Sequence, residues 1–146
     1  MLNNHLQTTS VSQNRKKWER ELAADNTRRE AQAVQDAAET LHENFVKRAF
    51  QTDSICQLAT ASPHPVLVCG DFNSLPSSYT YHRLSESFKD GFKTGGHGYM
   101  YTYRYGKRML RIDYAFHSPE LECTDYYSPN LDLCSDHNPV IFTVKY

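Results

Sequence analysis

The spacing of hydrophobic residues changes along the chain, and each change predicts a different element. Residues 2–6 are typical of a short strand, and the polar residues 7–14 are typical of a loop. From Thr27 onward, apolar residues recur at three- and four-residue steps, which predicts one long amphipathic helix that ends after Ala61, before Pro63 and Pro65. The face expected to be buried carries Ala31, Val34, Ala38, Leu41, Phe45 and Ala49.

The second part of the chain is rich in strand signals. Residues 65–69 form a continuous apolar run, which predicts a strand buried on both faces. Residues 77–88 predict a shorter helix, and four glycines at 91–98 predict a loop. Runs rich in Tyr, Ile, Val, Phe and Thr predict mostly antiparallel strands at 99–105, 110–117, 121–127 and 139–145. These elements together predict a layered α/β (α+β) fold.

Composition narrows the class of protein. The 146 residues suit one domain or part of a larger one. The chain has sixteen Lys and Arg and seventeen Asp and Glu, so its net charge of -1 gives no overall electrostatic attraction for nucleic acid or anionic lipid. The four cysteines are widely spaced, which argues against a zinc site or a disulfide framework. There is no apolar run of membrane-spanning length and no signal-peptide pattern, and the compartment stays open because a longer parent could carry a signal.

The first candidate for chemistry is Gly70-Asp71-Phe72-Asn73-Ser74, directly after the predicted buried strand. Asp71 and Asn73 lie on one side of an extended segment at the end of that strand, where α/β sheets form their sites. Asp71 could accept a proton from water, and the Asn73 amide could donate to a phosphoryl oxygen. A capped turn explains this motif equally well.

The second candidate is Ser135-Asp136-His137-Asn138-Pro139, before the last predicted strand. Asp136 could bind a hard metal ion beside the His137 imidazole, although a turn cap explains this motif alone more simply. Asp113 lies in the strand-like run Arg111-Ile112-Asp113-Tyr114, where an acidic residue is costly to bury unless it is paired. A histidine would be its natural partner.

The chain resembles the endonuclease/exonuclease/phosphatase superfamily, whose members are DNase I-like. The resemblance spans nearly all of the chain, and its motifs occur in the family's order. They are His5-Leu6, Arg29 with Gln32-Ala33, Gly70-Asp71-Phe72-Asn73-Ser74, Thr102-Tyr103, Arg111-Ile112-Asp113-Tyr114 and Ser135-Asp136-His137-Asn138-Pro139. The resemblance implies the C-terminal half of a four-layer α/β sandwich, with a mixed, mostly antiparallel sheet and a long helix packed on it.

The resemblance also implies hydrolysis of a phosphodiester or phosphomonoester by in-line attack of water, with Mg²⁺ or Mn²⁺ as cofactor. Asp71 would orient or deprotonate the water and contact the metal, and Asp136 would bind the metal directly or through water. Asn73 and His137 would bind phosphoryl oxygens, Asp113 would hold the His137 ring, and His5 would donate to the phosphate or the leaving group.

The sequence departs from the family pattern in its first residues. An Asn and a metal-binding Glu belong to the family's first half and have no counterpart before His5, so residues 1–146 are expected to be a partial domain without its N-terminal half. We expect this chain to be catalytically incomplete on its own, and to self-associate through the sheet face that the other half would cover. The alternative is a noncatalytic module that binds a phosphate ligand or a protein.

The substrate is not predicted beyond its phosphate ester. Tyrosines alternate through residues 99–105, followed by Lys107, Arg108 and Arg111, so these residues could stack bases and hold the phosphates of a nucleic acid. A hairpin with one tyrosine-lined face and solvated charges is the simpler interpretation. The residues after Phe72 are most similar to deadenylase-type or general bacterial members of the superfamily.

Overall fold

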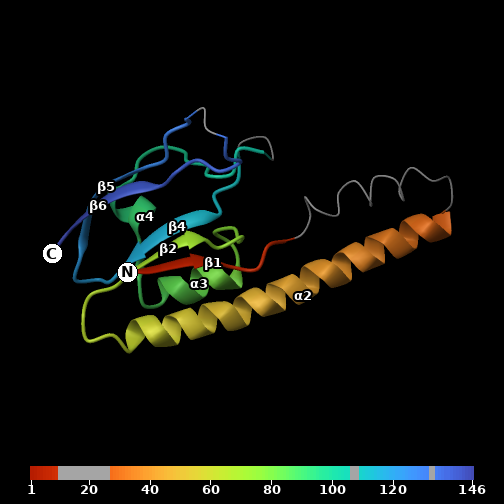
Figure 1. Cartoon of the computed structure of the whole chain (residues 1–146), viewed down its shortest axis with the longest axis horizontal. Coiled ribbons are helices and arrows are strands. Elements are labelled where there is room, and N and C mark those ends of the chain that lie inside the picture. The colour runs from red at the N-terminus through yellow and green to blue at the C-terminus, as the bar shows by residue number, and fades with distance from the viewer. Residues whose placement is uncertain (10–26, 106–108, 132–133) are drawn as a thin grey trace.

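The computed structural model of the chain describes residues 1–9, 27–105, 109–131 and 134–146. Its elements, in chain order, are β1 (Leu2–His5), α2 (Thr27–Thr60), β2 (Leu67–Asp71), α3 (Tyr79–Ser85), β3 (Lys89–Asp90), α4 (Gly91–Gly95), β4 (Asp113–His117), β5 (Glu122–Tyr127) and β6 (Ile141–Lys145). Helices α2 and α3 lie on one side of a sheet, and α4 lies with β5 and β6 on the other (Figure 1). The predicted layered α/β fold is confirmed.

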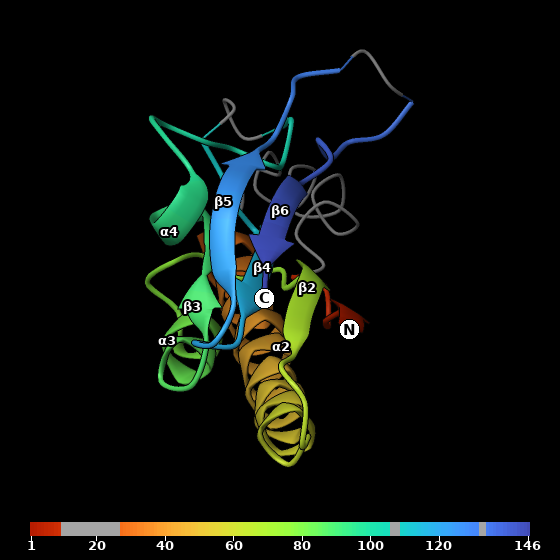
Figure 2. The same cartoon turned by 90° about the vertical axis from the view of Figure 1, so that its left-hand side faces the viewer.

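The sheet has the strand order β1-β2-β4-β3, and β5 and β6 form a separate antiparallel pair (Figure 2). β1 runs parallel to β2, whereas β2 and β3 both run antiparallel to β4. Because β1 is parallel to β2, both strands end at the same edge of the sheet, where His5 is the register partner of Asp71. The sheet is therefore mixed, and its topology brings two predicted site residues together.

The main core fills the space between the sheet and the two helices. Strands β2 and β4 alternate their side chains, so that Val68 and Phe116 face the helices while Cys69 and Ala115 face the β5–β6 pair. The helices meet the sheet with Ile55, Cys56, Ala59, Tyr81 and Leu84. Burial of these apolar side chains fixes the end of β2, because Phe72 packs in the same core with no exposed surface.

The prediction of the buried face of α2 was wrong. Val34 and Phe45 are 60% and 53% exposed, and the buried face instead carries Asn44, Arg48 and Thr52, followed by the apolar positions named above. The N-terminal part of α2 extends beyond the sheet (Figure 1), and among its described apolar residues Ala33 is buried while Val34 is exposed. The buried polar face is compensated by hydrogen bonds, such as those of the Thr52 hydroxyl to the Arg48 carbonyl and the Thr80 hydroxyl.

Two other segments differ from their predicted structure. Residues 99–105 form no strand, and Tyr103 makes only isolated bridges to Leu110 and His137. The glycine-rich segment predicted as a loop contains α4, because the Asp90 side chain accepts a hydrogen bond from the Phe92 N–H and caps this short helix. β2 is buried on one face rather than two, since Val68 is fully buried while Leu67 and Cys69 are half-buried.

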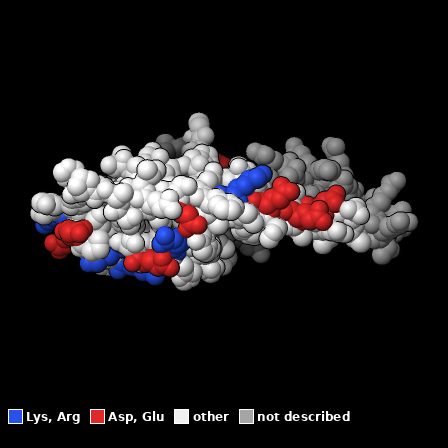
Figure 3. Space-filling model, turned by 90° about the horizontal axis from the view of Figure 1, so that it is seen from below, with Lys and Arg blue, Asp and Glu red and all other residues white. Residues whose placement is uncertain are grey.

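The helical face of the molecule carries charges of both signs. Figure 3 shows Lys and Arg interspersed with Asp and Glu over this face, and Arg83 illustrates the pattern by pairing with both Asp53 and Glu86. This interspersion agrees with the absence of an overall field expected from composition. None of the helices in the described ranges has the length and apolar character needed to cross a membrane.

Candidate active site

The loop after β2 is held in a strained, well-anchored conformation. Gly70 has a φ of +136°, and a Cβ there would lie 1.8 Å from the Asn4 carbonyl oxygen of β1, so only glycine fits. Asn73 has a φ of 47°, which is uncommon for a residue with a side chain. Phe72 anchors the loop by packing edge-on against the Tyr114 and Phe116 rings. The predicted capped turn and the predicted site therefore occupy the same residues.

The Asp71 carboxylate is oriented by Asn73. The Asn73 backbone N–H donates to Asp71 Oδ1 at 2.8 Å, and the Asn73 side-chain Nδ2 donates to Asp71 Oδ2 at 3.1 Å. The same Nδ2 also donates to the Leu6 carbonyl at 3.1 Å. Both amide hydrogens of Asn73 are thus engaged within the protein, which gives this residue an orienting role toward Asp71.

Asp113 is placed by the fully buried Thr102. The Thr102 hydroxyl oxygen accepts hydrogen bonds from the backbone N–H groups of Ile112 and Asp113, both at 3.0 Å. The Thr102 carbonyl accepts from the Asn138 N–H at 2.7 Å. Thr102 therefore ties the start of β4 to the loop that carries His137.

His137 and Asp113 form a bonded pair. His137 Nδ1 lies 2.8 Å from Asp113 Oδ2, and because a carboxylate only accepts, Nδ1 carries the proton. The Tyr103 ring packs edge-on against the imidazole at 5.2 Å between centroids. These contacts turn Nε2 of His137 toward Asp71, whose Oδ2 lies 3.9 Å away.

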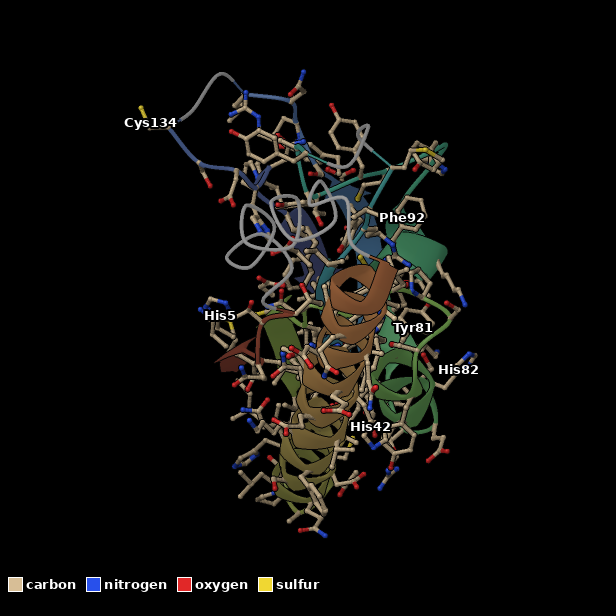
Figure 4. The ribbon with its side chains drawn as sticks, turned by 90° about the vertical axis from the view of Figure 1, so that its right-hand side faces the viewer. His5, His42, Tyr81, His82, Phe92 and Cys134 are labelled. Carbon is tan, nitrogen blue, oxygen red and sulfur yellow. The ribbon has the colours of Figure 1, made fainter. Side chains whose placement is uncertain are left out.

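The structure brings together most of the residues predicted for the site. Asp71, Asp113 and His137 each offer a ligand atom within 4.8 Å of the others. His5 Nε2 lies 3.6 Å from Asp71 Oδ2, with its side chain largely exposed at the end of β1 (Figure 4). Asp136 lines the same cavity but is exposed and is not part of this trio. His42 and His82 project from the outer surfaces of α2 and α3 (Figure 4).

Burial and neighbouring charges shift the two central ionisable groups. Burial raises the pKa of the Asp71 carboxyl, and the nearby Asp113 adds to this, while the Asn73 N–H and the two histidines act in the opposite direction. The bond to Asp113 raises the pKa of the His137 imidazole against the effect of its own burial. The site therefore favours a protonated imidazole beside a carboxylate whose proton affinity is higher than usual.

A cavity of about 1090 Å³ opens in front of these residues. Its lining includes the polar residues His5, Asp71, Asn73, Asp113, Asp136 and His137, and Phe45 and Arg48 of α2. Leu75, Tyr79, Tyr103 and Tyr105 also line it. The volume is that of a site for a small organic ligand.

Sequence reasoning missed two residues of α2 that hold the segment after β1. Arg48 Nη1 donates to the Gln7 carbonyl at 2.8 Å, and the Gln51 side-chain oxygen accepts from the Gln7 N–H at 2.9 Å. Arg48 and Gln51 repeat the Arg-x-x-Gln spacing that the sequence suggested at Arg29 and Gln32. The Arg29 side chain lies outside the described part of the chain, and Gln32 is exposed and bonds to Asp36. This second Arg-x-x-Gln motif lies closer to Gly70 and could have identified Arg48 and Gln51 from the sequence.

Comparisons with known proteins identify the family of this chain. The profile of the Endonuclease/Exonuclease/phosphatase family matches residues 16–137. The comparison with curated proteins gave no match.

Several solved structures are similar in fold. A conserved protein of unknown function from Enterococcus faecalis has a TM-score of 0.62 at 19% identity, covering 69% of this chain and 45% of that one. An endonuclease/exonuclease/phosphatase from Bacteroides vulgatus has a TM-score of 0.60 at 25% identity, covering 68% and 44%. A mannosyl-6-phosphatase from Bacteroides thetaiotaomicron has a TM-score of 0.52 at 22% identity, covering 71% and 46%.

The chain thus spans less than half the length of each of these structures, with coverages of 45%, 44% and 46%. The family profile, in contrast, matches most of the chain, from residue 16 to residue 137, including Asp71, Asn73, Asp113 and His137. The chain belongs to the endonuclease/exonuclease/phosphatase family.

Proposed function

We propose that this chain carries one wall of a divalent-metal phosphoesterase site, which hydrolyses a phosphodiester or phosphomonoester by in-line attack of water. The observation that carries the proposal is the trio of Asp71, Asp113 and His137, which line the cavity with their side-chain O and N atoms within 4.8 Å of one another. Family membership supports phosphate-ester chemistry for the intact protein.

The donor set suits Mg²⁺ or Mn²⁺. Asp71 and Asp113 are register partners on neighbouring strands, and a cation between the two carboxylates would offset their repulsion. Asp113 binds His137 through Oδ2, which leaves Oδ1 for the ion, and Asp136 at the cavity wall would bind through water. When bound, the metal would polarise a phosphoryl oxygen and make the attacking water more acidic.

Four side chains of the protein would carry out the other steps of the reaction. Asp71 would accept a proton from the water, and its raised pKa makes it a stronger base near neutral pH. His137, held protonated by Asp113, would donate from Nε2 to a phosphoryl oxygen as negative charge builds there. Asn73 would orient Asp71, in place of the phosphoryl contact suggested by sequence, and the exposed His5 would donate to the leaving group.

We further propose that this chain alone turns over slowly. The chain covers less than half of each similar solved structure, and the carboxylates that it contributes to the cavity are Asp71, Asp113 and Asp136. A single wall with Asp71 and Asp113 as direct ligands leaves the ion with few protein ligands, so its position would be loose. The competing interpretation is a noncatalytic module that binds phosphate groups without hydrolysis.

The experiment is phosphate or nitrophenol release from nitrophenyl phosphate and bis-nitrophenyl phosphate, with Mn²⁺ or with chelator. We expect slow metal-dependent turnover, well below about 1 per second, that disappears in Asp71→Asn and His137→Gln and persists in the exposed control His82→Gln. Equal rates in all four proteins would contradict the site. Fast turnover that is abolished in Asp71→Asn would support the proposed phosphoesterase site, and it would contradict the proposal that this chain alone turns over slowly.

A further inference from the structure

Arg48 is a buried cation in the wall of the cavity that Asp71 and His137 also line. It projects from α2 with only 1% of its surface exposed, and it lines the cavity together with Phe45 of the preceding helical turn. Among the described residues, no carboxylate forms an ion pair with it. Buried arginines are normally paired, because an uncompensated charge in a protein interior is unfavourable.

The hydrogen bonds of Arg48 leave one edge of its guanidinium unused. Nη1 donates to the Gln7 carbonyl at 2.8 Å, and the Phe45 ring stacks on the group at 4.7 Å from its centroid. Nε and Nη2 are both buried and have no hydrogen-bond partner. These two nitrogens lie on the same edge of the planar group, and together they form the fork that binds carboxylate or phosphate with two parallel hydrogen bonds.

We propose that Arg48 is an anion subsite of this cavity, which binds a second phosphate or carboxylate group of the phosphate ester whose scissile group lies at Asp71 and His137. That such an ester is hydrolysed at Asp71 and His137 rests on the proposed function, whereas anion binding at Arg48 does not. One cavity of about 1090 Å³ is lined by Arg48 and by Asp71 and His137, and its volume leaves room for the organic part of such a ligand. The substrate class is therefore a phosphate ester with two anionic ends.

The charge distribution favours an incoming anion. Burial lowers the pKa of the Arg48 guanidinium, and the opposing effect on it comes from Asp71. An anion bound at the fork would compensate both the unpaired charge and the two unsatisfied donors, which are unfavourable when buried. Because Nε and Nη2 are closed to solvent, binding requires a small opening of the wall that the half-exposed Phe45 helps to form.

The test follows the side-chain Nε–H signal of Arg48 by nuclear magnetic resonance in the full chain, with a metal chelator present. Inorganic phosphate, pyrophosphate and acetate are titrated separately at constant ionic strength. We expect a saturable shift of this signal with one or more of the three anions, and the anion that binds tightest identifies the group as phosphate or carboxylate. An Arg48 signal that none of them moves would overturn the proposal, whatever the variants do.

Variants of Arg48 distinguish anion binding by the two-nitrogen fork from anion binding by positive charge alone. Arg48→Lys keeps the charge but loses the fork, and Arg48→Met loses both, so each should weaken binding of that anion by about tenfold or more. Lys47→Met, which removes an exposed cation from the neighbouring position of α2, should bind as the original chain does. Equal affinity in Arg48→Lys, Arg48→Met and the original chain would assign the anion elsewhere and overturn the proposal.

Turnover distinguishes the failure of this inference from that of the proposed function. If Asp71→Asn loses hydrolysis but phosphate, pyrophosphate and acetate have no effect on the Arg48 signal, the proposed phosphoesterase site is supported and the anion subsite is contradicted. Anion binding at Arg48 without metal-dependent hydrolysis would retain the subsite and favour the noncatalytic module.

Discussion

Asp71 and Asp113 face each other as register partners across the antiparallel strands β2 and β4. Alternation puts both carboxylates on the same face of the sheet at its end, where Asp113 adds to the rise in the Asp71 pKa caused mainly by burial. Two partly buried carboxylates so arranged work against folding at neutral pH. Such an arrangement is typical of a site organised for a cation or a proton rather than for stability.

Replacing Asp71 by Asn should stabilise the metal-free protein. A group whose pKa is raised in the folded state contributes stability below its unfolded pKa, near 3.8 for Asp71, and loses it as pH rises through the folded value. At neutral pH Asp71→Asn therefore removes an unfavourable charge while keeping an acceptor for the Asn73 N–H. We expect a gain of about 1 kcal/mol in the free energy of unfolding by urea, in chelator.

The matched control for this change is Asp125→Asn, on the exposed side of β5, which should alter stability little. A loss of stability in Asp71→Asn, larger than in the control, would mean that Asp71 is a structural cap and would contradict the electrostatic interpretation.

The His137–Asp113 bond should give stability a dependence on pH. Because the bond raises the His137 pKa in the folded state, its contribution is complete below the unfolded value of about 6.5 and is lost as pH rises through the folded value. Urea unfolding of the metal-free chain should therefore show a fall in stability from weakly acidic to weakly alkaline pH. Asp113→Asn should flatten this fall, and His82→Asn should leave it unchanged. Identical pH profiles for the original chain and Asp113→Asn would count against the pair.

Gly70 should tolerate no side chain. In Gly70→Ala the new Cβ would lie 1.8 Å from the Asn4 carbonyl oxygen, so β1 would have to leave the sheet and His5 would move away from Asp71. We expect a loss of about 3 kcal/mol or more in thermal or urea unfolding. Gly98→Ala provides the control, since its φ of +69° is also left-handed but no atom lies within 4 Å, and its cost should be about 1 kcal/mol.

Comparable losses in the two alanine variants would show that backbone strain, rather than contact with β1, explains the requirement for glycine at position 70. The contact between β1 and β2 would then have no special role in placing His5.

The fold class and the local position of the site could be predicted from sequence because their signals are local. The apolar run before Gly70 predicts β2, and Gly70-Asp71-Phe72-Asn73 predicts a polar turn at its end. The buried face of α2 could not be predicted, since Asn44, Arg48 and Thr52 are buried through hydrogen bonds to distant backbone and side-chain groups rather than through hydrophobic spacing. Tertiary contacts of this kind leave no period in the sequence.

The roles of single site residues were also only partly predictable. The pairing of Asp113 with a histidine followed from the cost of burying an acidic residue, and the bond to His137 agrees with it. The engagement of both Asn73 amide hydrogens with Asp71 and Leu6 could not be predicted, because it depends on the parallel pairing of β1 with β2.

Self-association of this chain remains a prediction. Within the described residues β6 pairs only with β5, and Ile141 on β6 is 41% exposed. Apolar side chains exposed on a sheet face, as predicted from the sequence, favour contact with a second copy. We expect concentration-dependent dimers in sedimentation experiments and a shift to monomer in Ile141→Lys, with the exposed Glu120→Lys as control. A single monomeric species at all concentrations would contradict this expectation.

The most direct test of the central claim, that Asp71 and Asp113 bind a divalent metal ion beside His137, is a Mn²⁺ titration of the chain followed by calorimetry. The claim predicts saturable binding of one ion per chain, weakened by about tenfold or more in Asp71→Asn and unchanged in Asp125→Asn. Binding of equal strength in all three proteins, or no binding to the original chain, would contradict it.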